Sequence, residues 1–202
     1  MADDIRCTLG SVAQDLWGTP RSAECADSAQ PPAPVFPPFD QLWSSVDETV
    51  DWMEMLAHDM PNDGLTTSAQ WATYRRYAAQ VLNGDPAAYL AVLKLADPLK
   101  DLTPWAEKFD TVCVSADMLR VTFTAIPELL QREGSRYPAG MSLRIARDLM
   151  ALLPVLQVEV LTWCEDKPCM QVLFERSELQ KVRFGFIDPV GFALQCGATF
   201  GG

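Results

Sequence analysis

Four side chains that could bind a divalent metal or transfer protons fall on one strip of a predicted helix. They are Asp47, Asp51, Glu54 and His58, at spacings of i, i+4, i+7 and i+11. Carboxylates and imidazole are metal ligands, and a Glu54/His58 pair would suit acid–base chemistry. The strip flanks the apolar stripe of the helix, and no second helix carries a matching Glu/His set. Two interpretations stay open: a metal or acid–base site at Asp51, Glu54 and His58, and a solvated acidic face.

The single histidine, His58, restricts the enzyme mechanisms that the chain can support. Any Ser-His-Asp or Cys-His mechanism would have to use it, and zinc motifs built on paired histidines are absent. The phosphate-binding patterns Gly-x-x-x-x-Gly-Lys and Gly-x-Gly-x-x-Gly are absent as well. We therefore predict no catalytic residue, no cofactor and no stoichiometric transition metal. No motif is specific enough to indicate a known family.

Cys164 and Cys169 flank an expected turn at 165–168, which would allow their thiols to face each other. Four residues separate them, whereas a Cys-x-x-Cys metal knuckle has two, and no second pair follows. A chain of this length with this much core-forming material does not need a disulfide framework. Reduced thiols are the favoured interpretation, and whether the two cysteines pair stays open.

Four arginines gather within residues 132–148, which contain only two acidic residues, Glu133 and Asp148. These arginines are Arg132, Arg136, Arg144 and Arg147. Guanidinium groups prefer bidentate partners such as carboxylates and phosphates, so the segment is a candidate anion-binding site. The alternative is a helix face whose arginines pair with the surplus carboxylates of the protein itself. We favour this alternative because such pairs are common.

The elements around these residues begin with a predicted N-terminal arm. Residues 1–17 have the spacing of a short amphipathic helix whose apolar face consists of Ile5, Leu9, Val12, Leu16 and Trp17. Such a short helix is marginal in water and needs a surface to pack on, so we expect this face to bind a partner. Residues 18–39 contain six prolines, which remove amide donors at spacings that no helix tolerates. We predict an arm at 1–17, a Pro-rich linker or strap at 18–39 and a single globular domain at 40–202.

The middle of the chain is mainly helical by its pattern. An apolar stripe predicts an amphipathic helix over 41–60, and further helices are predicted up to Leu82, from Asp85-Pro86, from Thr103-Pro104 and over Ser142–Leu153. Residues 110–131 fit two structures, because β-branched residues typical of strands coincide with a helical stripe of apolar residues. We favour a helix after residue 115.

After Pro154 the period of the apolar residues changes to two, which is typical of strands. Runs around 158–160, 169–174 and 182–186, with a turn at 165–168, predict an antiparallel meander. Helices that precede strands favour an α+β fold, with a mainly helical N-terminal two-thirds followed by a C-terminal antiparallel β meander.

The formal net charge of −11 is unevenly distributed. Residues 1–60 hold eleven acids and two arginines, whereas residues 61–202 hold sixteen acids and fourteen bases. An acidic protein repels phosphate backbones, so we expect no nucleic-acid partner. No apolar run is long enough to span a membrane, and the N-terminus lacks the order of a signal peptide. We expect no membrane partner and a cytoplasmic location.

Taken together, these patterns favour a protein–protein interaction or regulatory module without catalytic activity, whose partner is another protein or a second copy of the chain. One alternative is an enzyme or metal-binding protein that uses the acidic/His helix face. The other is a non-catalytic subunit of a larger assembly, which exposed aromatic side chains would favour.

Overall fold

The computed structural model describes residues 39, 42–44, 49–60 and 68–201. The chain divides into two units, Met1–Pro34 and Val35–Gly202, and all described residues lie in the second. The helices are α1 (Trp52–Ala57), α2 (Ser68–Leu82), α3 (Pro86–Ala96), the 3-10 helix η2 (Lys100–Trp105), α4 (Pro127–Glu133), α5 (Arg136–Leu152), α6 (Arg176–Leu179), the 3-10 helix η3 (Phe184–Phe186) and α7 (Pro189–Gln195). The strands are β1 (Ala106–Ser115), β2 (Met118–Ala125), β3 (Gln157–Cys164), β4 (Lys167–Glu175) and β5 (Thr199–Phe200).

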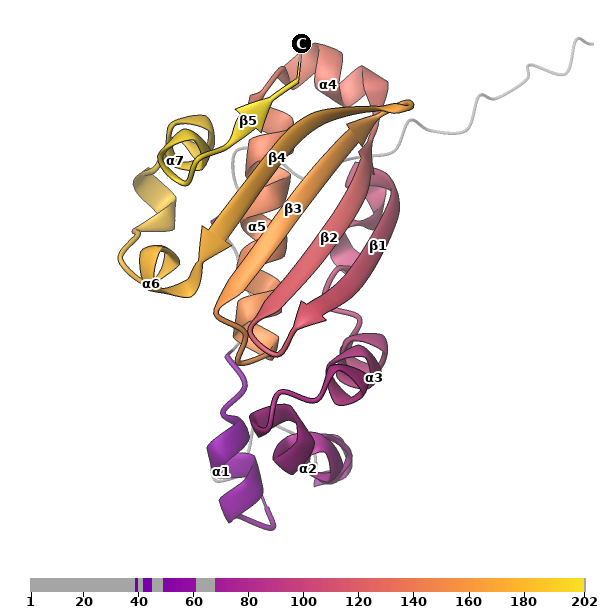
Figure 1. Ribbon diagram of the computed structural model, residues 1–202, viewed down its shortest axis with the longest axis vertical. Helices are drawn as coiled ribbons and strands as arrows, with labels where there is room; N and C mark the ends of the chain where they lie inside the picture. The colour runs from indigo at the N-terminus through magenta and orange to yellow at the C-terminus, as the bar shows by residue number, and fades with distance from the viewer. Residues whose placement is uncertain (1–38, 40–41, 45–48, 61–67, 202) are drawn as a thin grey trace, which may run out of the picture. The chain divides into compact units, whose positions relative to one another are not determined.

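The strands of the described residues form one mixed sheet in the order β1-β2-β3-β4-β5 (Figure 1). Hairpins join β1 to β2 and β3 to β4 in antiparallel pairs, and β5 pairs antiparallel with β4. The two hairpins meet through β2 and β3, which run parallel. A parallel pair needs a crossover connection, and here the crossover contains α4 and α5. The architecture is therefore mixed α/β, with helices between the strands in sequence.

This topology corrects the predicted α+β fold with a C-terminal antiparallel meander, which is wrong. Residues predicted to be helical after 115 form β2, and the preceding residues form β1. Leu119, Val121 and Phe123 are fully buried at a period of two, as expected for a strand with one face on the core. The predicted last strand is also wrong, because Phe184–Phe186 is a 3-10 turn.

Predictions that rest on strong local signals are confirmed for several elements. α2 ends at Leu82, and α3 begins at Pro86 with Asp85 as its N-cap, whose Oδ1 accepts the amide of Ala87 at 2.9 Å. The antiparallel hairpin around residues 165–166 is also present. The helix predicted over 41–60 is limited to Trp52–Ala57 in the part of that range that the structure describes.

Helix α5 is the centre of the core, and only Arg147 of its residues from Tyr137 to Leu152 is not buried. The sheet covers one side of α5, and α7 and the segment around Phe39 and Trp43 pack against it elsewhere. Gly140 makes this close approach possible, because a Cβ at that position would lie 2.9 Å from Cε3 of Trp43. α5 therefore holds together parts of the chain that are distant in sequence.

Tyr137, near the start of α5, is a fully buried tyrosine that ties the helix to the ends of two other segments. Its hydroxyl donates to the carbonyl of Trp105 and accepts the amide N–H of Ile126 at 3.1 Å. Burial raises the pKa of Tyr137 from 10.0 to about 12, because desolvation disfavours the phenolate.

We expect Tyr137 to ionise well above pH 10, the ordinary pKa of tyrosine. Its folded-state pKa is raised, so the stability that it contributes is present below pH 10 and is lost as the pH rises through about 12. Phenolate absorbance after a rapid pH jump, recorded before unfolding, should show a late phase near pH 12 that Tyr137→Phe removes. A Tyr137→Phe protein that keeps the late phase would contradict this assignment.

Candidate functional site

The acidic/His strip predicted from the sequence lies at the two ends of α1. Asp51 is the N-cap, and its Oδ1 accepts the amide of Glu54 at 2.9 Å. His58 is the C-cap; its N–H donates to the carbonyl of Glu54, and its own carbonyl accepts the Trp71 indole at 3.2 Å. No group of three or more His, Cys, Asp or Glu in the described part of the chain is placed to hold a metal. Asp47 lies outside the described residues.

Two of the four clustered arginines, Arg144 and Arg147, project from α5 towards the segment at residues 42–43. Arg144 is buried and bonds Asp148 (Nε–Oδ2 2.6 Å), Asp101 (Nη2–Oδ2 3.0 Å) and the carbonyl of Leu42. Its guanidinium therefore has partners from three parts of the chain.

Arg147 donates from Nη1 to the carbonyl of Trp43, and its guanidinium lies 3.6 Å from the ring centre of Phe184. Desolvation lowers the pKa of Arg147 to about 10, which still leaves it charged at neutral pH. The other two arginines differ in their surroundings: Arg136 lies over the ring of Trp43, and Arg132 forms an exposed pair with Glu133 at 2.8 Å. The structure thus brings three of the four to the segment around Trp43, while Arg132 lies on α4.

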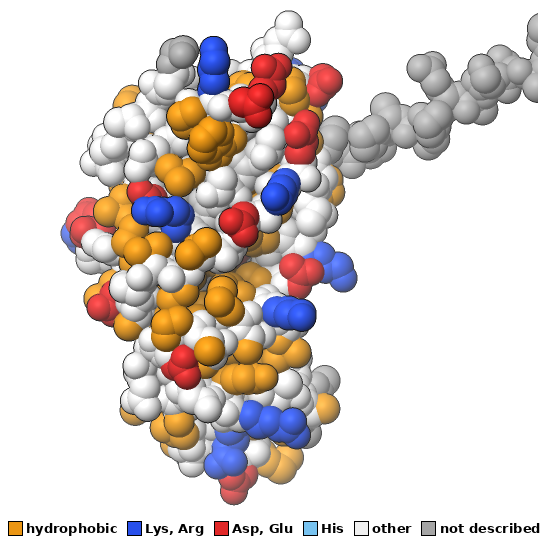
Figure 2. Space-filling view, turned by 45° about the vertical axis from the view of Figure 1, so that its right-hand side comes forward, with side chains coloured by type: hydrophobic (Ala, Val, Ile, Leu, Met, Phe, Trp, Pro, Cys, Tyr) orange, Lys and Arg blue, Asp and Glu red, His pale blue; other side chains and the backbone are white. Residues whose placement is uncertain are grey.

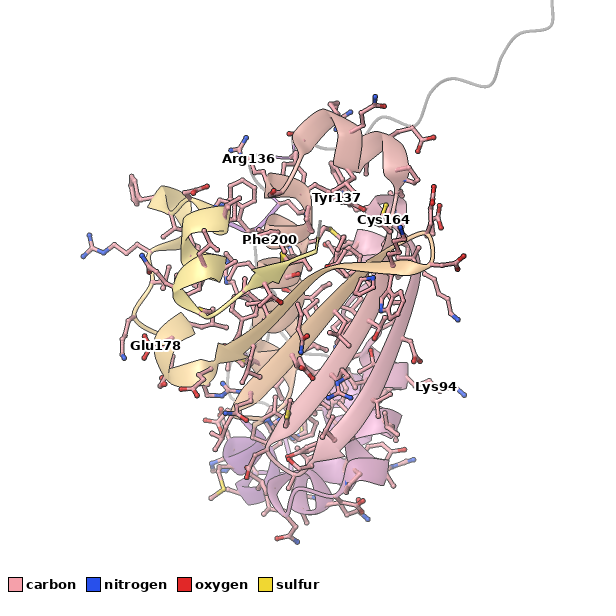
Figure 3. All side chains as sticks on the ribbon, turned by 45° about the horizontal axis from the view of Figure 1, so that its top comes forward. Lys94, Arg136, Tyr137, Cys164, Glu178 and Phe200 are labelled. Carbon is pink, nitrogen blue, oxygen red and sulfur yellow. The ribbon has the colours of Figure 1, made fainter. Side chains whose placement is uncertain are left out.

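Cys164 and Cys169 are free thiols at the hairpin end of the sheet, the end where Figure 3 labels Cys164 and Tyr137. Burial raises the pKa of Cys169, and the neighbouring thiol of Cys164 adds to the shift. A raised pKa keeps Cys169 in its less reactive thiol form at neutral pH. The predicted apolar arm at 1–17 lies outside the described residues, and so does the linker up to Pro38.

The sheet has a second face, opposite α5, that sequence reasoning missed. Alternation along the strands divides the side chains: Val158, Val160 and Thr162 of β3 are fully buried towards α5, and the residues between them point the other way. We call this second side the outer sheet face. In Figure 1 the helices lie behind or beside the sheet, and none of the described residues forms a helix or strand over this face.

A polar network lies at the middle of the outer sheet face. Arg120 of β2 and Glu159 of β3 are register partners, with Nε of Arg120 2.5 Å from Oε2 of Glu159. Gln171 of β4 donates to Oε1 of the same carboxylate at 2.7 Å. Glu159 is only 8% exposed although no layer covers it, because its neighbours enclose it. The network fixes three adjacent strands at one point of the surface.

Apolar side chains surround this network. Leu161, Trp163 and Leu173 are partly exposed on β3 and β4, and Val112 on β1 is 50% exposed. Register places Val112, Arg120, Glu159 and Leu173 in one row across four strands. Figure 2, which views the sheet obliquely from the side of β1, shows hydrophobic side chains interspersed with charged ones. The face therefore combines a rigid backbone, apolar area and a fixed polar centre.

Alternation over 119–124 was the sequence signal for this face, but the competing helical stripe concealed it.

No helix in the described residues is long and apolar enough to cross a membrane. Comparison of the chain with protein-family models, with curated proteins and with solved structures gives no match in any of the three.

Proposed function

We propose that the protein is a protein–protein interaction or regulatory module without catalytic activity, and that the outer sheet face is its main binding surface. One observation carries the proposal: Leu161, Trp163 and Leu173 are partly exposed on a sheet face that no helix or strand of the described residues covers. Contiguous exposed apolar side chains on a folded protein are typical of interaction sites.

The composition of this face suits a protein partner. Interface centres are enriched in tryptophan and arginine, and here Trp163 and Arg120 lie on the same face. The carboxylate of Glu159 already accepts hydrogen bonds from Arg120 and Gln171, so a protein that binds over it would not leave a buried charge unpaired. Because the backbone of these residues is already held in paired strands, little backbone conformational entropy is lost on binding.

Other parts of the proposal follow from charge and from the sequence. The acidic chain favours a protein over a nucleic acid, and a cytoplasmic location stays part of the proposal. The arm at residues 1–17 stays a predicted second contact for a partner. A role as a non-catalytic subunit would use surfaces of the same kind, and Phe186, which is 91% exposed, would add to them.

Site-specific photo-crosslinking tests the outer sheet face. A photo-reactive amino acid at Thr122, the register neighbour of Leu161, is expected to give a covalent adduct in cells with one defined protein or with a second copy of the chain. Leu161→Asp should reduce this adduct about tenfold or more, because a charge at the centre of an apolar interface costs over 1 kcal/mol.

Leu95→Asp is the matched control, because Leu95 is 48% exposed on α3, away from the sheet face. It should leave the adduct unchanged and keep the melting temperature of the parent protein within a few degrees, as expected for an exposed position. Leu161→Asp, at a partly exposed position, should keep the circular dichroism spectrum of the folded protein. An adduct that is equally strong with Leu161→Asp, or the lack of any specific adduct, would overturn the proposal.

A further inference from the structure

The C-terminal end of α5 is capped by groups from distant parts of the chain. The last carbonyls of a helix have no partner within it and must be satisfied from outside. Here the amide of Val50 donates to Ala151 at 2.9 Å, and the indole of Trp52 donates to Leu152 at 2.6 Å. Arg176, at the start of α6, donates to the carbonyls of Met150, Leu153 and Val155 at 2.6–2.8 Å.

A concavity of about 370 Å³, which we call the α5 groove, lies beside these caps. Its wall is mainly apolar and includes Val50, Trp52 and Leu153, and its rim includes Met53 and Leu156. The rim residues are 64% and 52% exposed, so they meet solvent at the mouth. The volume lies within the range of small-molecule sites, which is roughly 300–1,000 Å³.

Arg176 contributes a cation to this groove. Its Nε and Nη2 are used by the α5 carbonyls, and Nη1 has no hydrogen bond to any described residue. No carboxylate of the described residues lies within salt-bridge distance of Arg176. Asp51 is the acidic residue among those that line the groove, and its Oδ1 accepts a hydrogen bond from the amide N–H of Glu54.

We propose that the α5 groove binds a small amphiphilic carboxylate, whose carboxylate accepts hydrogen bonds from Nη1 of Arg176 while its apolar tail lies against Val50, Leu153 and Leu156. A half-buried cation that is held in place by three carbonyls is preorganised for an anion, and charge-assisted hydrogen bonds are stronger than neutral ones. The groove is formed by other residues than the outer sheet face, so the proposal is independent of the function proposed above.

Two probes of similar size, octanoate and 1-octanol, test the proposal on the unaltered full-length chain. The indole N–H signal of Trp52 in nitrogen-15 NMR spectra, assigned by its loss in Trp52→Phe, is the local reporter. Octanoate is expected to shift this signal saturably with an affinity about tenfold or more above that of 1-octanol, because only the acid can bond Arg176. Equal affinities, or no saturable shift with octanoate, would overturn the proposal.

Variants locate the binding within the groove. Leu156→Asp places an acid at the mouth and should abolish the octanoate shift, whereas Leu194→Asp, at a position 54% exposed on α7, should leave it unchanged. Arg176→Gln should remove the preference for octanoate over octanol, and this ratio is measured within one variant. Leu161→Asp should not alter octanoate binding, which separates this test from that of the outer sheet face. Retained binding in Leu156→Asp would overturn the assignment of the groove.

Discussion

Replacing Arg144 with methionine is expected to lower the free energy of unfolding by about 3–5 kcal/mol, the cost of removing one partner from a buried ion pair. Arg144 is 5% exposed and Asp148 fully buried, and the two lie one turn apart on α5 with Nε 2.6 Å from Oδ2. Methionine has a similar length and no charge. The lost stability therefore measures the cost of leaving the buried carboxylate of Asp148 without its cation. Urea unfolding followed by circular dichroism measures it.

Two comparisons show whether the effect comes from burial. Arg132→Met removes the arginine of an exposed ion pair and should cost less than about 1 kcal/mol. Asp148→Leu, added to Arg144→Met, should recover much of the loss, since an apolar pair in place of a buried ion pair is often neutral. If Arg144→Met costs no more than Arg132→Met, burial of the Arg144–Asp148 pair does not determine its contribution to stability.

Arg176→Met is expected to lower the free energy of unfolding by about 2–4 kcal/mol, the second large effect. The arginine satisfies the carbonyls of Met150, Leu153 and Val155 at and beyond the end of α5. Methionine provides no donor, so these carbonyls must turn to water. Because the side chain is only half-buried, water reaches part of the site, and the loss is smaller than the sum of three charged hydrogen bonds.

The control for this variant is Arg183→Met, because Arg183 is exposed and removing its charge should change stability by less than about 0.5 kcal/mol. Arg176→Lys should be intermediate, since a single ammonium group cannot reach all three carbonyls in the geometry of the guanidinium fork. Hydrogen exchange of the Trp52 indole, which caps Leu152, should accelerate in Arg176→Met. Equal unfolding energies for Arg176→Met and Arg183→Met would contradict the role of Arg176 as a cap.

Features whose cause lies within a few residues were predictable from the sequence. Asp85 and Pro86 together start α3, since a side chain that caps the first turn and a residue that needs no amide partner act locally. The hairpin between β3 and β4 has the same character, because the period of two on each side and the polar turn at 165–166 are contained in one short segment.

The stretch from 115 to 125 could not be decided in this way. Leu119 and Phe123 lie on one face of a helix at i and i+4, and also on one face of a strand together with Val121. The strand is selected by pairing on both sides of β2: with β1 through a local hairpin and, in parallel, with β3, which lies beyond α4 and α5 in the sequence. A contact between residues so far apart in sequence leaves no periodic signal near either of them.

The sequence by itself determined the residue types available for chemistry: one histidine, thiols without knuckle spacing, and arginines in excess over acids in one segment. Only the tertiary structure decided what these groups do. Arg144 became a core ion-pair residue because the chain around Leu42 returns to α5, and Arg176 became a helix cap because β4 ends beside the last turn of the same helix. Local spacing encodes the direction of a side chain, whereas its partners depend on which distant segment packs against it.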